Sequence, residues 1–338
     1  MTAPLSLRAP EFWWRKPGAD AALLYPVSAI YGAIAARRLS RPGYKPKIPV
    51  LCVGNPTLGG AGKTPTAIAI ATHLKTLGKN PFFLTRGYGG KLKGPLLADP
   101  GKHDARDIGD EAPLLAAIAP TIIAQDRAAG AQLAEASGAD ALIMDDGFQN
   151  PSLEKNFSLL VVDGVKGIGN GLPFPSGPLR APLGAQLRRA QAMLVIGAGE
   201  AGERAEALAI KAELAVLRGK LAAQPESAAQ LSGVRVLAYA GIGAPEKFFR
   251  SLEETGAIVA ARRSFGDHYR YAAADASSLL AQSVRTGLQL VTTEKDAARM
   301  HGDPALAGLL AESKQFRVRL AFDDETAALA LIGKALEI

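Results

Sequence analysis

The sequence predicts an α/β protein that consists of two doubly wound α/β/α domains and an N-terminal helix of interfacial character. Three observations lead to this fold class. The chain has 338 residues, of which 48% are hydrophobic, so it can bury more than one core. Short, continuous apolar runs alternate with segments of helical periodicity, which is typical of parallel sheets covered on both faces. A glycine-rich loop follows the first of these runs, where doubly wound domains bind ligands.

Residues 1–40 have the pattern of an amphipathic segment that associates with a membrane. Two tryptophans precede an apolar stretch over residues 19–36, and arginines follow it. Aromatic rings suit the headgroup level of a bilayer, and arginines suit anionic lipid heads. The apolar side chains that recur at helical spacing are Leu23, Val27, Ile30 and Ile34. Because the stretch is short for a spanning helix and contains Pro26 and Gly32, we expect it to lie on the membrane. A spanning helix and a core helix are the alternatives.

Residues 41–210 are expected to form the first domain. Its predicted strands are 49–53, 81–85, 121–124, 141–144, 159–162 and 192–196. The predicted helices between several of them are 64–77, 111–118 and 128–137. Because the strands are continuously apolar, they should be parallel and buried on both faces, and ligand chemistry should gather at their carboxyl ends.

The strand pattern lapses over residues 211–231, which we interpret as a linker to a smaller α/β domain of residues 232–338. The predicted strands of this domain are 234–240, 257–261, 288–292 and 316–321. Its predicted helices are 245–254, 272–284 and one that begins at residue 324. The cleft between two such domains is the usual place to close over a substrate.

The charge and the cysteine content narrow the class of partner. The formal net charge of +7 suits an anionic partner, such as a phosphorylated lipid, a membrane surface or a nucleic acid. Only 6% of the residues are aromatic and no nucleic-acid-binding motif is visible, so we expect no nucleic acid partner. We also expect no obligate protein partner. The single cysteine, Cys52, excludes an internal disulfide and a cysteine metal site, which fits a reducing compartment.

Residues 54–65 form the glycine-rich loop and give the first domain a Rossmann-like, P-loop NTPase character. The residues that we expect to contact nucleotide are Asn55, Thr57, Gly59, Gly60, Ala61, Gly62, Lys63 and Thr64. Backbone N–H groups and the helix N-terminus attract phosphate, Lys63 would reach the β- and γ-phosphates, and the Thr64 hydroxyl would hold Mg²⁺. Thr57 stands where the common pattern has glycine, so a positive φ is less available there.

Two pairs of acids follow at predicted strand and helix ends. Asp145 and Asp146 end an apolar strand, which is how an aspartate reaches phosphate-bound Mg²⁺. Adjacent strand residues point to opposite faces, so either could be the metal partner, and a simple Asp-Gly turn is the alternative. Asp110 and Glu111 begin a predicted helix, where capping is the alternative. Asp110 is a candidate for the base that phosphoryl transfer to a hydroxyl requires.

Four further side chains lie at expected ligand edges. His268 is in a loop of the second domain and can hydrogen-bond a catalytic carboxylate if domain closure brings the two together. Arg86 and Tyr88 follow the second strand, and Arg127 follows the next one. Arginine suits a planar phosphate clamp, and tyrosine could contact a sugar or a chain. Arginines that pair with local carboxylates are the alternative.

Seven motifs in this order resemble those of the tetraacyldisaccharide 4'-kinase family of the lipid A pathway, over nearly the whole chain. They are the loop from Gly54-Asn55 to Lys63-Thr64-Pro65, Thr85-Arg86-Gly87-Tyr88-Gly89, Gly109-Asp110-Glu111, Asp145-Asp146-Gly147-Phe148-Gln149, Gly177-Pro178-Leu179-Arg180, Asp267-His268-Tyr269 and Thr293-Glu294-Lys295-Asp296.

The resemblance implies transfer of the γ-phosphoryl group of ATP to the 4'-hydroxyl of a tetraacylated glucosamine disaccharide 1-phosphate, which gives lipid IV-A. It implies that Lys63 and Thr64 serve the phosphates and Mg²⁺, that Asp110 is the base supported by His268, and that Asp145 or Asp146 contributes to the metal region. The implied head-group or phosphate contacts are Arg86, Tyr88, Arg127, Gln149 and Arg180. The expected partners are the acylated lipid and an anionic surface, at the cytoplasmic face of the bacterial inner membrane.

Two departures and one alternative function accompany the resemblance. Asn150 stands where the family commonly has histidine, and Ala181 where it has glutamate, so any role of those side chains is absent or supplied elsewhere. The alternative is a membrane-associated partition or positioning ATPase. Such proteins carry a lysine at the position of Leu58 that reaches the partner's nucleotide, and its absence disfavours a dimerising mechanism.

Overall fold

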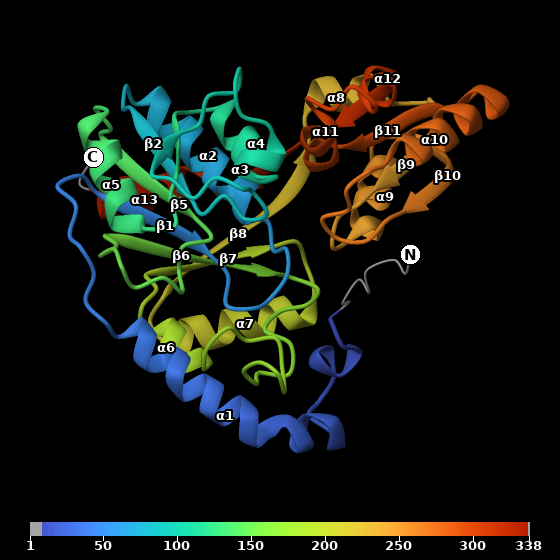
Figure 1. Cartoon of the computed structure of the whole chain (residues 1–338). Coiled ribbons are helices and arrows are strands. Elements are labelled where there is room, and N and C mark those ends of the chain that lie inside the picture. The colour runs from blue at the N-terminus through green and yellow to red at the C-terminus, as the bar shows by residue number, and fades with distance from the viewer. Residues whose placement is uncertain (1–8, 337–338) are drawn as a thin grey trace.

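The computed structural model describes residues 9–336 and contains two sheets, each covered by helices on both faces (Figure 1). We call the nine-stranded sheet with its helices the large unit, and the four-stranded sheet with its helices the small unit. Residues 1–8 of the expected amphipathic segment and 337–338 of the expected second domain lie outside the described residues. The predicted fold class, two α/β/α units with an N-terminal apolar helix, is confirmed.

The large sheet is a parallel sheet with one antiparallel strand at each edge. In spatial order its strands are β13 (Val318–Phe322), β8 (Ala215–Ala223), β7 (Ala192–Ile196), β6 (Phe157–Asp163), β1 (Val50–Gly54), β5 (Ala141–Asp145), β2 (Pro81–Thr85), β4 (Thr121–Ile123) and β3 (Leu96–Leu97). The strands from β8 to β4 run parallel, whereas β13 and β3 pair antiparallel with their neighbours. Strands β1, β2, β5, β6 and β7 are buried along their whole length, as their apolar runs predict.

Helices cover both faces of this sheet. They are α2 (Lys63–Thr76), α3 (Ala105–Ile108), α4 (Ala112–Ala116), α5 (Arg127–Ala136), α6 (Leu183–Leu187), α7 (Glu200–Lys211) and α13 (Glu325–Ala335). Residues of α5, α6 and α7 belong to one apolar core cluster, and residues of α2, α4 and α13 belong to another. Because β1 lies between β6 and β5, the loop after β1 opens at the carboxyl ends of neighbouring parallel strands.

The small unit is a parallel sheet of four strands. Their order is β10 (Ile258–Ser264), β9 (Arg235–Ala240), β11 (Gln289–Thr293) and β12 (Ser313–Phe316). Its helices are α8 (Pro225–Ala229), α9 (Pro245–Glu254), α10 (Ala273–Thr286), α11 (Glu294–Met300) and α12 (Ala307–Glu312). Phe248, Phe249 and Leu252 of α9 pack on one face, and residues of α10 and α12 pack on the other. In Figure 1 this unit lies beside the large unit, on the side of α3 and α4.

Two expectations about the chain between the sheets are wrong. The expected linker 211–231 contains the nine-residue strand β8, whose charged side chains are exposed beside the sheet edge and hid the apolar pattern. The expected strand 316–321 is two strands in two sheets, because β12 ends at Phe316 and β13 begins at Val318. Strand β13 and helix α13 return to the large sheet, so the small unit is an insertion in the large one (Figure 1).

Helix α1 (Ala19–Leu39) lies on the large unit through its small side chains. Ser28 Oγ donates to the Pro173 carbonyl oxygen at 2.7 Å, and a Cβ on Gly32 would approach Pro173 and Pro182 to 3.3 Å. Its large side chains point outward: Leu23 is 82% exposed, and Val27, Ile30 and Ile34 are exposed too. Only 17% of the apolar part of α1 is buried, so the alternative of a core helix is excluded. The helix is long and apolar enough, by length and composition, to cross a membrane.

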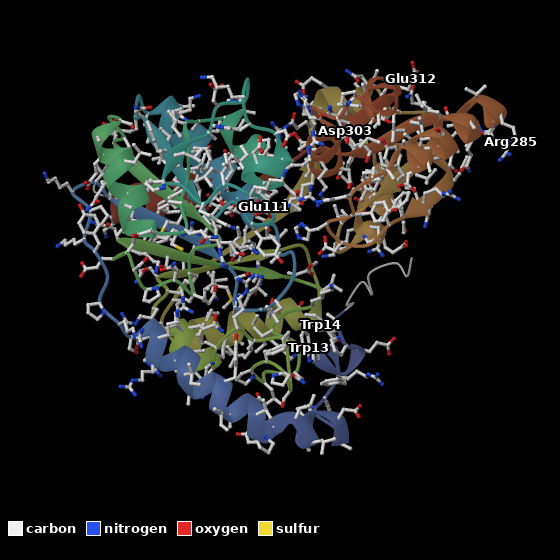
Figure 2. The ribbon with its side chains drawn as sticks, in the orientation of Figure 1. Trp13, Trp14, Glu111, Arg285, Asp303 and Glu312 are labelled. Atoms are coloured by element: carbon white, nitrogen blue, oxygen red, sulfur yellow. The ribbon has the colours of Figure 1, made fainter. Side chains whose placement is uncertain are left out.

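The short helix η1 (Glu11–Trp14) precedes α1 and fixes its start. Trp13 is buried and donates from Nε1 to the Pro175 carbonyl oxygen at 2.9 Å. Its ring meets that of Phe174 edge to face, with 6.1 Å between the centroids. Trp14 lies under the Lys166 ammonium, which is 5.1 Å from the ring centroid. Figure 2 shows the two tryptophans next to each other at the N-terminal end of the described chain.

Candidate active site

The loop between β1 and α2 has the geometry of a phosphate-binding turn. Gly62 precedes α2 with a φ of 92°, and no described side chain caps the helix. The first N–H groups of α2 therefore face the loop and, with the helix dipole, favour an anion. The Asn55 side-chain amide donates to the Gly59 carbonyl oxygen at 2.9 Å. This bond closes residues 55–59, and Gly60 and Ala61 follow it before α2 begins.

Thr57 has no need of the positive φ that its place in the motif suggested. It forms a β-bridge with Leu179 and is not among the non-glycine residues of 9–336 with positive φ. The turn is made at Gly59 and Gly62, whose φ angles are 111° and 92°. The threonine therefore carries no conformational cost, and the loop differs from the common pattern without strain.

Asp145 and Thr64 meet at the start of α2. Asp145 ends β5 and lies opposite Val53 of β1, so its carboxylate reaches the helix. Thr64 Oγ1 donates to Asp145 Oδ2 at 2.9 Å, whereas Oδ1 is buried without a partner among the described residues. Burial, followed by the negative charge of Glu111, raises the pKa of Asp145 to about 7. A buried carboxylate oxygen without a donor calls for a cation or a proton, so this pair fits Mg²⁺.

Asp146 has cationic partners, unlike its neighbour. It forms a two-point ion pair with Arg180 at 3.1 and 3.2 Å, and it lies 3.7 Å from Lys63 Nζ. Burial acts to raise the pKa of Asp146, but Lys63 and Arg180 outweigh it and hold that pKa below its ordinary value. Asp146 also has a φ of 54°, a strained conformation that clusters at functional sites. The two aspartates are thus distinct, since no cation of residues 9–336 forms an ion pair with Asp145, whereas Asp146 has two such partners.

Gln149 and Arg180 donate hydrogen bonds to backbone carbonyl oxygens of the loop between β1 and α2. Gln149 Nε2 donates to the Asn55 carbonyl oxygen at 3.0 Å, and Arg180 Nε donates to the Thr57 carbonyl oxygen at 3.0 Å. Arg180 is therefore occupied by Asp146 and by the loop backbone at once. Both residues therefore bind the backbone of the loop between β1 and α2.

Asp110 and His268 come together from the two units. His268 Nδ1 lies 2.7 Å from Asp110 Oδ2, and since a carboxylate only accepts, the imidazole donates. The hydrogen bond to Asp110 raises the pKa of His268. Burial acts to raise the pKa of Asp110, but the His268 bond and the Arg299 charge lower it below its ordinary value. His268 has a φ of 55°, so both this residue and Asp146 are strained. The predicted acid–histidine pair is present in the structure.

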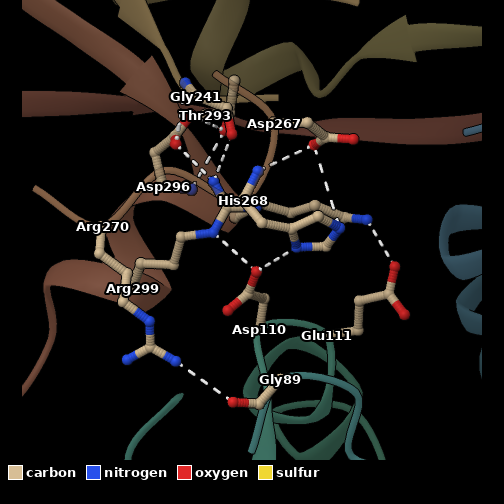
Figure 3. A network of polar contacts seen from close by, with 11 residues as sticks. Gly89, Asp110, Glu111, Gly241, Asp267, His268, Arg270, Thr293, Asp296 and Arg299 are labelled. Carbon is tan, nitrogen blue, oxygen red and sulfur yellow. Dashed lines mark hydrogen bonds and ion pairs between the residues drawn. The ribbon is translucent and has the colours of Figure 1, made fainter. Parts of the chain in front are cut away.

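Helix α11 supplies two cations to this junction that the sequence reasoning did not identify. Arg299 Nε donates to Asp110 Oδ2 at 2.7 Å, and Lys295 Nζ lies 2.7 Å from Glu111 Oε1. Glu111 is labelled at the junction of the units in Figure 2, and Figure 3 shows His268 and Arg299 pointing at the same carboxylate. The charge of Lys63 acts to lower the pKa of Glu111, and the charge of Glu111 acts to raise the pKa of Lys63. The contact between the units therefore lies near the loop between β1 and α2. The spacing of Lys295 and Arg299, four residues apart on one helix, was the available signal.

Of the remaining residues expected to contact substrate, Arg86 and Tyr88 lie at the surface and Arg127 lies in the interior. Arg86 and Tyr88 are exposed after β2, and the Tyr88 ring lies edge to face with His268 at 5.5 Å between centroids. Arg127 is only 3% exposed and donates to the Ala124 carbonyl oxygen, while its Nε has no partner among the described residues. Burial lowers the pKa of Arg127 to about 10. Tyr88 thus joins the junction, and Arg127 lies buried at the start of α5.

The two departures from the family pattern have structural roles here. The Asn150 side-chain oxygen accepts from the backbone N–H of Ser152 at 2.9 Å and from its hydroxyl at 2.6 Å, which fixes a turn. Ala181 is fully buried and belongs to the core of the large unit. Neither residue brings a titratable group to the site.

A family model and curated relatives match nearly the whole chain. The model described as tetraacyldisaccharide-1-P 4'-kinase matches residues 20–337. A tetraacyldisaccharide 4'-kinase of Methylobacterium sp. (strain 4-46) is 54% identical over 324 residues, which cover 96% of this chain and 96% of the relative. One from Xanthobacter autotrophicus (strain ATCC BAA-1158 / Py2) is 50% identical over 334 residues, or 97% of each chain.

The fold is similar to that of a solved structure. The crystal structure of the LpxK protein of Aquifex aeolicus, described as an apo form in complex with ATP, superposes with a TM-score of 0.72 at 24% identity. The match covers 94% of this chain and 99% of that one. At this identity the likeness concerns the fold.

Proposed function

The chain belongs to the tetraacyldisaccharide-1-phosphate 4'-kinase family, and from this premise we propose which of its residues carry the reaction. It is a phosphotransferase that phosphorylates the 4'-hydroxyl of tetraacyldisaccharide 1-phosphate to give lipid IV-A in lipid A biosynthesis. The family match leaves no support for a partition or positioning ATPase. The observation that carries the residue assignment is the bond between Asp110 and His268, beside a loop shaped for phosphate.

ATP is the proposed phosphoryl donor, bound at the loop between β1 and α2. The open N-terminus of α2 would receive the phosphates, and Lys63 Nζ lies near Asp146 at the same place. Burial lowers the pKa of Lys63, so its ammonium gains from an anionic partner. The solved structure of the Aquifex aeolicus protein, which is described as a complex with ATP, agrees with this proposal.

Mg²⁺ is proposed to be held by the Thr64 hydroxyl and the Asp145 carboxylate. The unpartnered Oδ1 of Asp145 supports this choice, whereas Asp146 is already neutralised by Lys63 and Arg180. Within residues 9–336 no three His, Cys, Asp or Glu side chains cluster to hold a metal alone. Two protein oxygens then suit Mg²⁺, which commonly takes substrate phosphates and water as its other ligands. When bound, the ion supplies charge neutralisation at the phosphates.

Asp110 is proposed to accept the proton of the 4'-hydroxyl. The hydroxyl oxygen forms a bond to the γ-phosphorus, the bond from phosphorus to the bridging oxygen breaks, and ADP leaves with that electron pair. The hydroxyl proton passes to Asp110, whose other oxygen accepts from His268. His268 orients the carboxylate and belongs to the small unit, so the base is complete only when the units are in contact.

The division of labour between the units follows from this arrangement. We propose residues 41–210 as the part that binds nucleotide and lipid, and residues 232–338, apart from the returning β13 and α13, as the part that closes over the site. Tyr88 is proposed to contact the sugar head group, because its exposed ring lies against His268. Arg86 and Arg127 are proposed as contacts to substrate phosphate, since the Arg127 Nε lacks a partner in the described chain.

Helix α1 is proposed to lie on the cytoplasmic face of the inner membrane. Its large apolar side chains are exposed along one side, while its small ones pack on the protein. Trp14 and the arginines after the helix suit the headgroup region. An acylated substrate does not leave a bilayer readily, so an enzyme on its surface reaches the head group in place.

A product assay tests the reaction. Purified protein with ATP, Mg²⁺ and detergent-dispersed disaccharide 1-phosphate should yield the 4'-phosphorylated product by mass spectrometry. Folded protein that binds ATP but forms no product would contradict the proposal.

Vesicle sedimentation tests the membrane surface. Replacement of Leu23, Ile30 and Ile34 by glutamine should weaken binding to anionic vesicles by more than about tenfold, since each apolar side chain contributes roughly 1.5–3 kcal/mol when buried. These side chains are exposed, so folding should be unaffected. Val284→Gln in α10, where the side chain is 84% exposed, is the matched control and should bind as the unaltered chain does. Equal binding by all the variants would mean that another surface anchors the protein.

A further inference from the structure

The segment Thr293-Glu294-Lys295-Asp296 forms the N-cap and first turn of helix α11, and Arg299 follows one turn later. Thr293 Oγ1 accepts from the Asp296 N–H at 3.2 Å and donates to the Asp296 carboxylate at 2.7 Å. The motif therefore starts the helix and fixes an aspartate at its first turn.

Asp296 in turn holds Arg299 in a single orientation. Asp296 is fully buried, and its Oδ1 accepts from the Gly241 N–H at 3.0 Å and from the Arg299 guanidinium at 2.8 Å. The same guanidinium nitrogen donates to the Gly241 carbonyl oxygen at 2.6 Å. The Arg299 side chain is only 4% exposed. A planar guanidinium that is held at one edge has its Nε direction fixed, and here Nε points at Asp110.

Two donors converge on the same oxygen of Asp110. His268 Nδ1 and Arg299 Nε each lie 2.7 Å from Oδ2, while no residue of 9–336 hydrogen-bonds to Oδ1 (Figure 3). We propose that Arg299 is a positioning residue for phosphoryl transfer, which holds Oδ2 beside His268 so that Oδ1 faces the substrate hydroxyl. This inference rests on the proposed role of Asp110 as the base.

The charges around Asp110 fit a positioning role better than an activating one. Arg299 and His268 both lower the pKa of Asp110, which makes it a weaker base. In phosphoryl transfer the protein contributes mainly placement and charge, so a well-placed weak base is adequate. The other charged groups near this carboxylate are Glu111 with its partner Lys295, Asp267 beside His268, and Asp296 behind Arg299. Arg299 is the cation among them that contacts Asp110 from a fully fixed position.

The test compares Arg299→Gln and Arg299→Lys with a matched control. Lys247→Gln removes a different ion pair between the units, with Asp163, and touches no group of the site. Arg299→Gln should lower kcat by about 10- to 100-fold with little change in the KM for ATP, because misplacement of a reacting group by about 1 Å costs on that order. Arg299→Lys keeps the charge without the planar fork and should lose about tenfold. Lys247→Gln should keep kcat within about twofold of the unaltered chain.

Titration of His268 by NMR gives a second readout, which the four histidines of the chain make tractable. The charge of Arg299 acts to lower the pKa of His268, so Arg299→Gln should shift that titration to higher pH while the Asp110 bond remains. Lys247→Gln should leave it in place.

Three results would overturn the inference: an unchanged kcat in Arg299→Gln, an equal loss in Lys247→Gln, or a His268 titration that does not move in Arg299→Gln. If Arg299→Gln does not fold, Arg299→Lys decides, and full kcat in it overturns the role. Asp110→Asn separates this inference from its premise. If that variant turns over normally, the proposed base is wrong, whereas if it is inactive and Arg299→Gln behaves as the unaltered chain, only the role of Arg299 fails.

Discussion

Two regions of the site differ in how the fold assembles them. We call residues 54–65, between β1 and α2, the nucleotide loop, and we call the contact of Asp110 with His268 and Arg299 the Asp110 junction. Thr64, Asp145 and Asp146 lie in one unit, at the ends of neighbouring elements of one parallel sheet, and β1 and β5 fix their distance. Asp110 and His268 lie in different units, 158 positions apart in the chain, and meet through polar contacts. The loop is therefore present whenever the large sheet is folded, whereas the junction also requires the small unit to be seated. Substitutions should separate nucleotide binding from turnover along this division.

The largest expected effect is at the junction. Asp110→Asn should lower kcat by about 10²- to 10⁴-fold, because the amide cannot accept the hydroxyl proton. Nucleotide affinity, measured by calorimetry with ATP and Mg²⁺, should stay within about twofold, since Asp110 makes no contact with the loop in the described structure. Asp99→Asn changes a surface carboxylate of the same unit and should leave both quantities unaltered. If Asp110→Asn also loses ATP affinity, nucleotide binding and turnover do not depend on separate regions of the site.

The next effect is at the loop and should have the opposite signature. Lys63→Met should lower kcat by about 10²- to 10³-fold, as for the loss of one group that stabilises transition-state charge, and it should weaken ATP binding as well. It also leaves the carboxylate of Asp146 with Arg180 as its remaining close cation. Lys75→Met, on the exposed side of the same helix, is the control for a general effect of the substitution. Tight ATP binding by Lys63→Met would contradict the assignment of this lysine.

The smallest effect is a pH dependence confined to the junction. The pKa of His268 is raised, so its bond stabilises the contact fully below its ordinary value near 6.5 and is lost as pH rises through the folded-state pKa. The pKa of Asp110 is lowered, so its contribution is present above its ordinary value near 3.8 and is lost as pH falls through the folded-state pKa. Contact between the units should therefore be strongest between these two values.

Hydrogen exchange can measure this difference. After correction for intrinsic rates, protection of residues 264–270 should decrease between about pH 6 and pH 8.5, while that of β1 stays constant. His268→Gln should lose this dependence. If the variant retains it, another group governs the contact.

The same division determines what the sequence could predict. The loop lies between a strand and a helix, and Asp145 and Asp146 end another apolar strand. Local pattern and parallel-sheet topology were therefore sufficient to place this pair of acids near the loop, but not to say which of them contacts Thr64. Partnership of Asp110 with His268 was available through family resemblance, because nothing local indicates which distant carboxylate a loop histidine meets. Arg299 was missed for the same reason, although its spacing from Lys295 placed both on one helix face.

Strand β8 was missed, and β13 was assigned to the second domain, for a different physical reason. In strand β8 the charged residues Arg218 and Lys220 interrupt the apolar pattern, and one of its neighbours in the sheet is the late strand β13. Only the folded chain shows that Ala223 pairs with Val318, across the whole of the small unit. The apolar stripe of α1 was predicted from its period, but the packing of its small residues on Pro173 and Pro182 was not.

The paired connection has a consequence for how weak the junction can be. The chain enters the small unit after β8 and leaves it into β13, and the Gln224 N–H donates to the Arg317 carbonyl oxygen at 2.9 Å where β8 ends and β13 begins. The small unit is connected to the large sheet at both of its ends, so its contact with the large unit is an intramolecular one. Its effective concentration is set by the tether, on the order of millimolar for short links, and not by the amount of enzyme in the cell. A few polar contacts that could not join two separate proteins are then sufficient to bring His268 to Asp110.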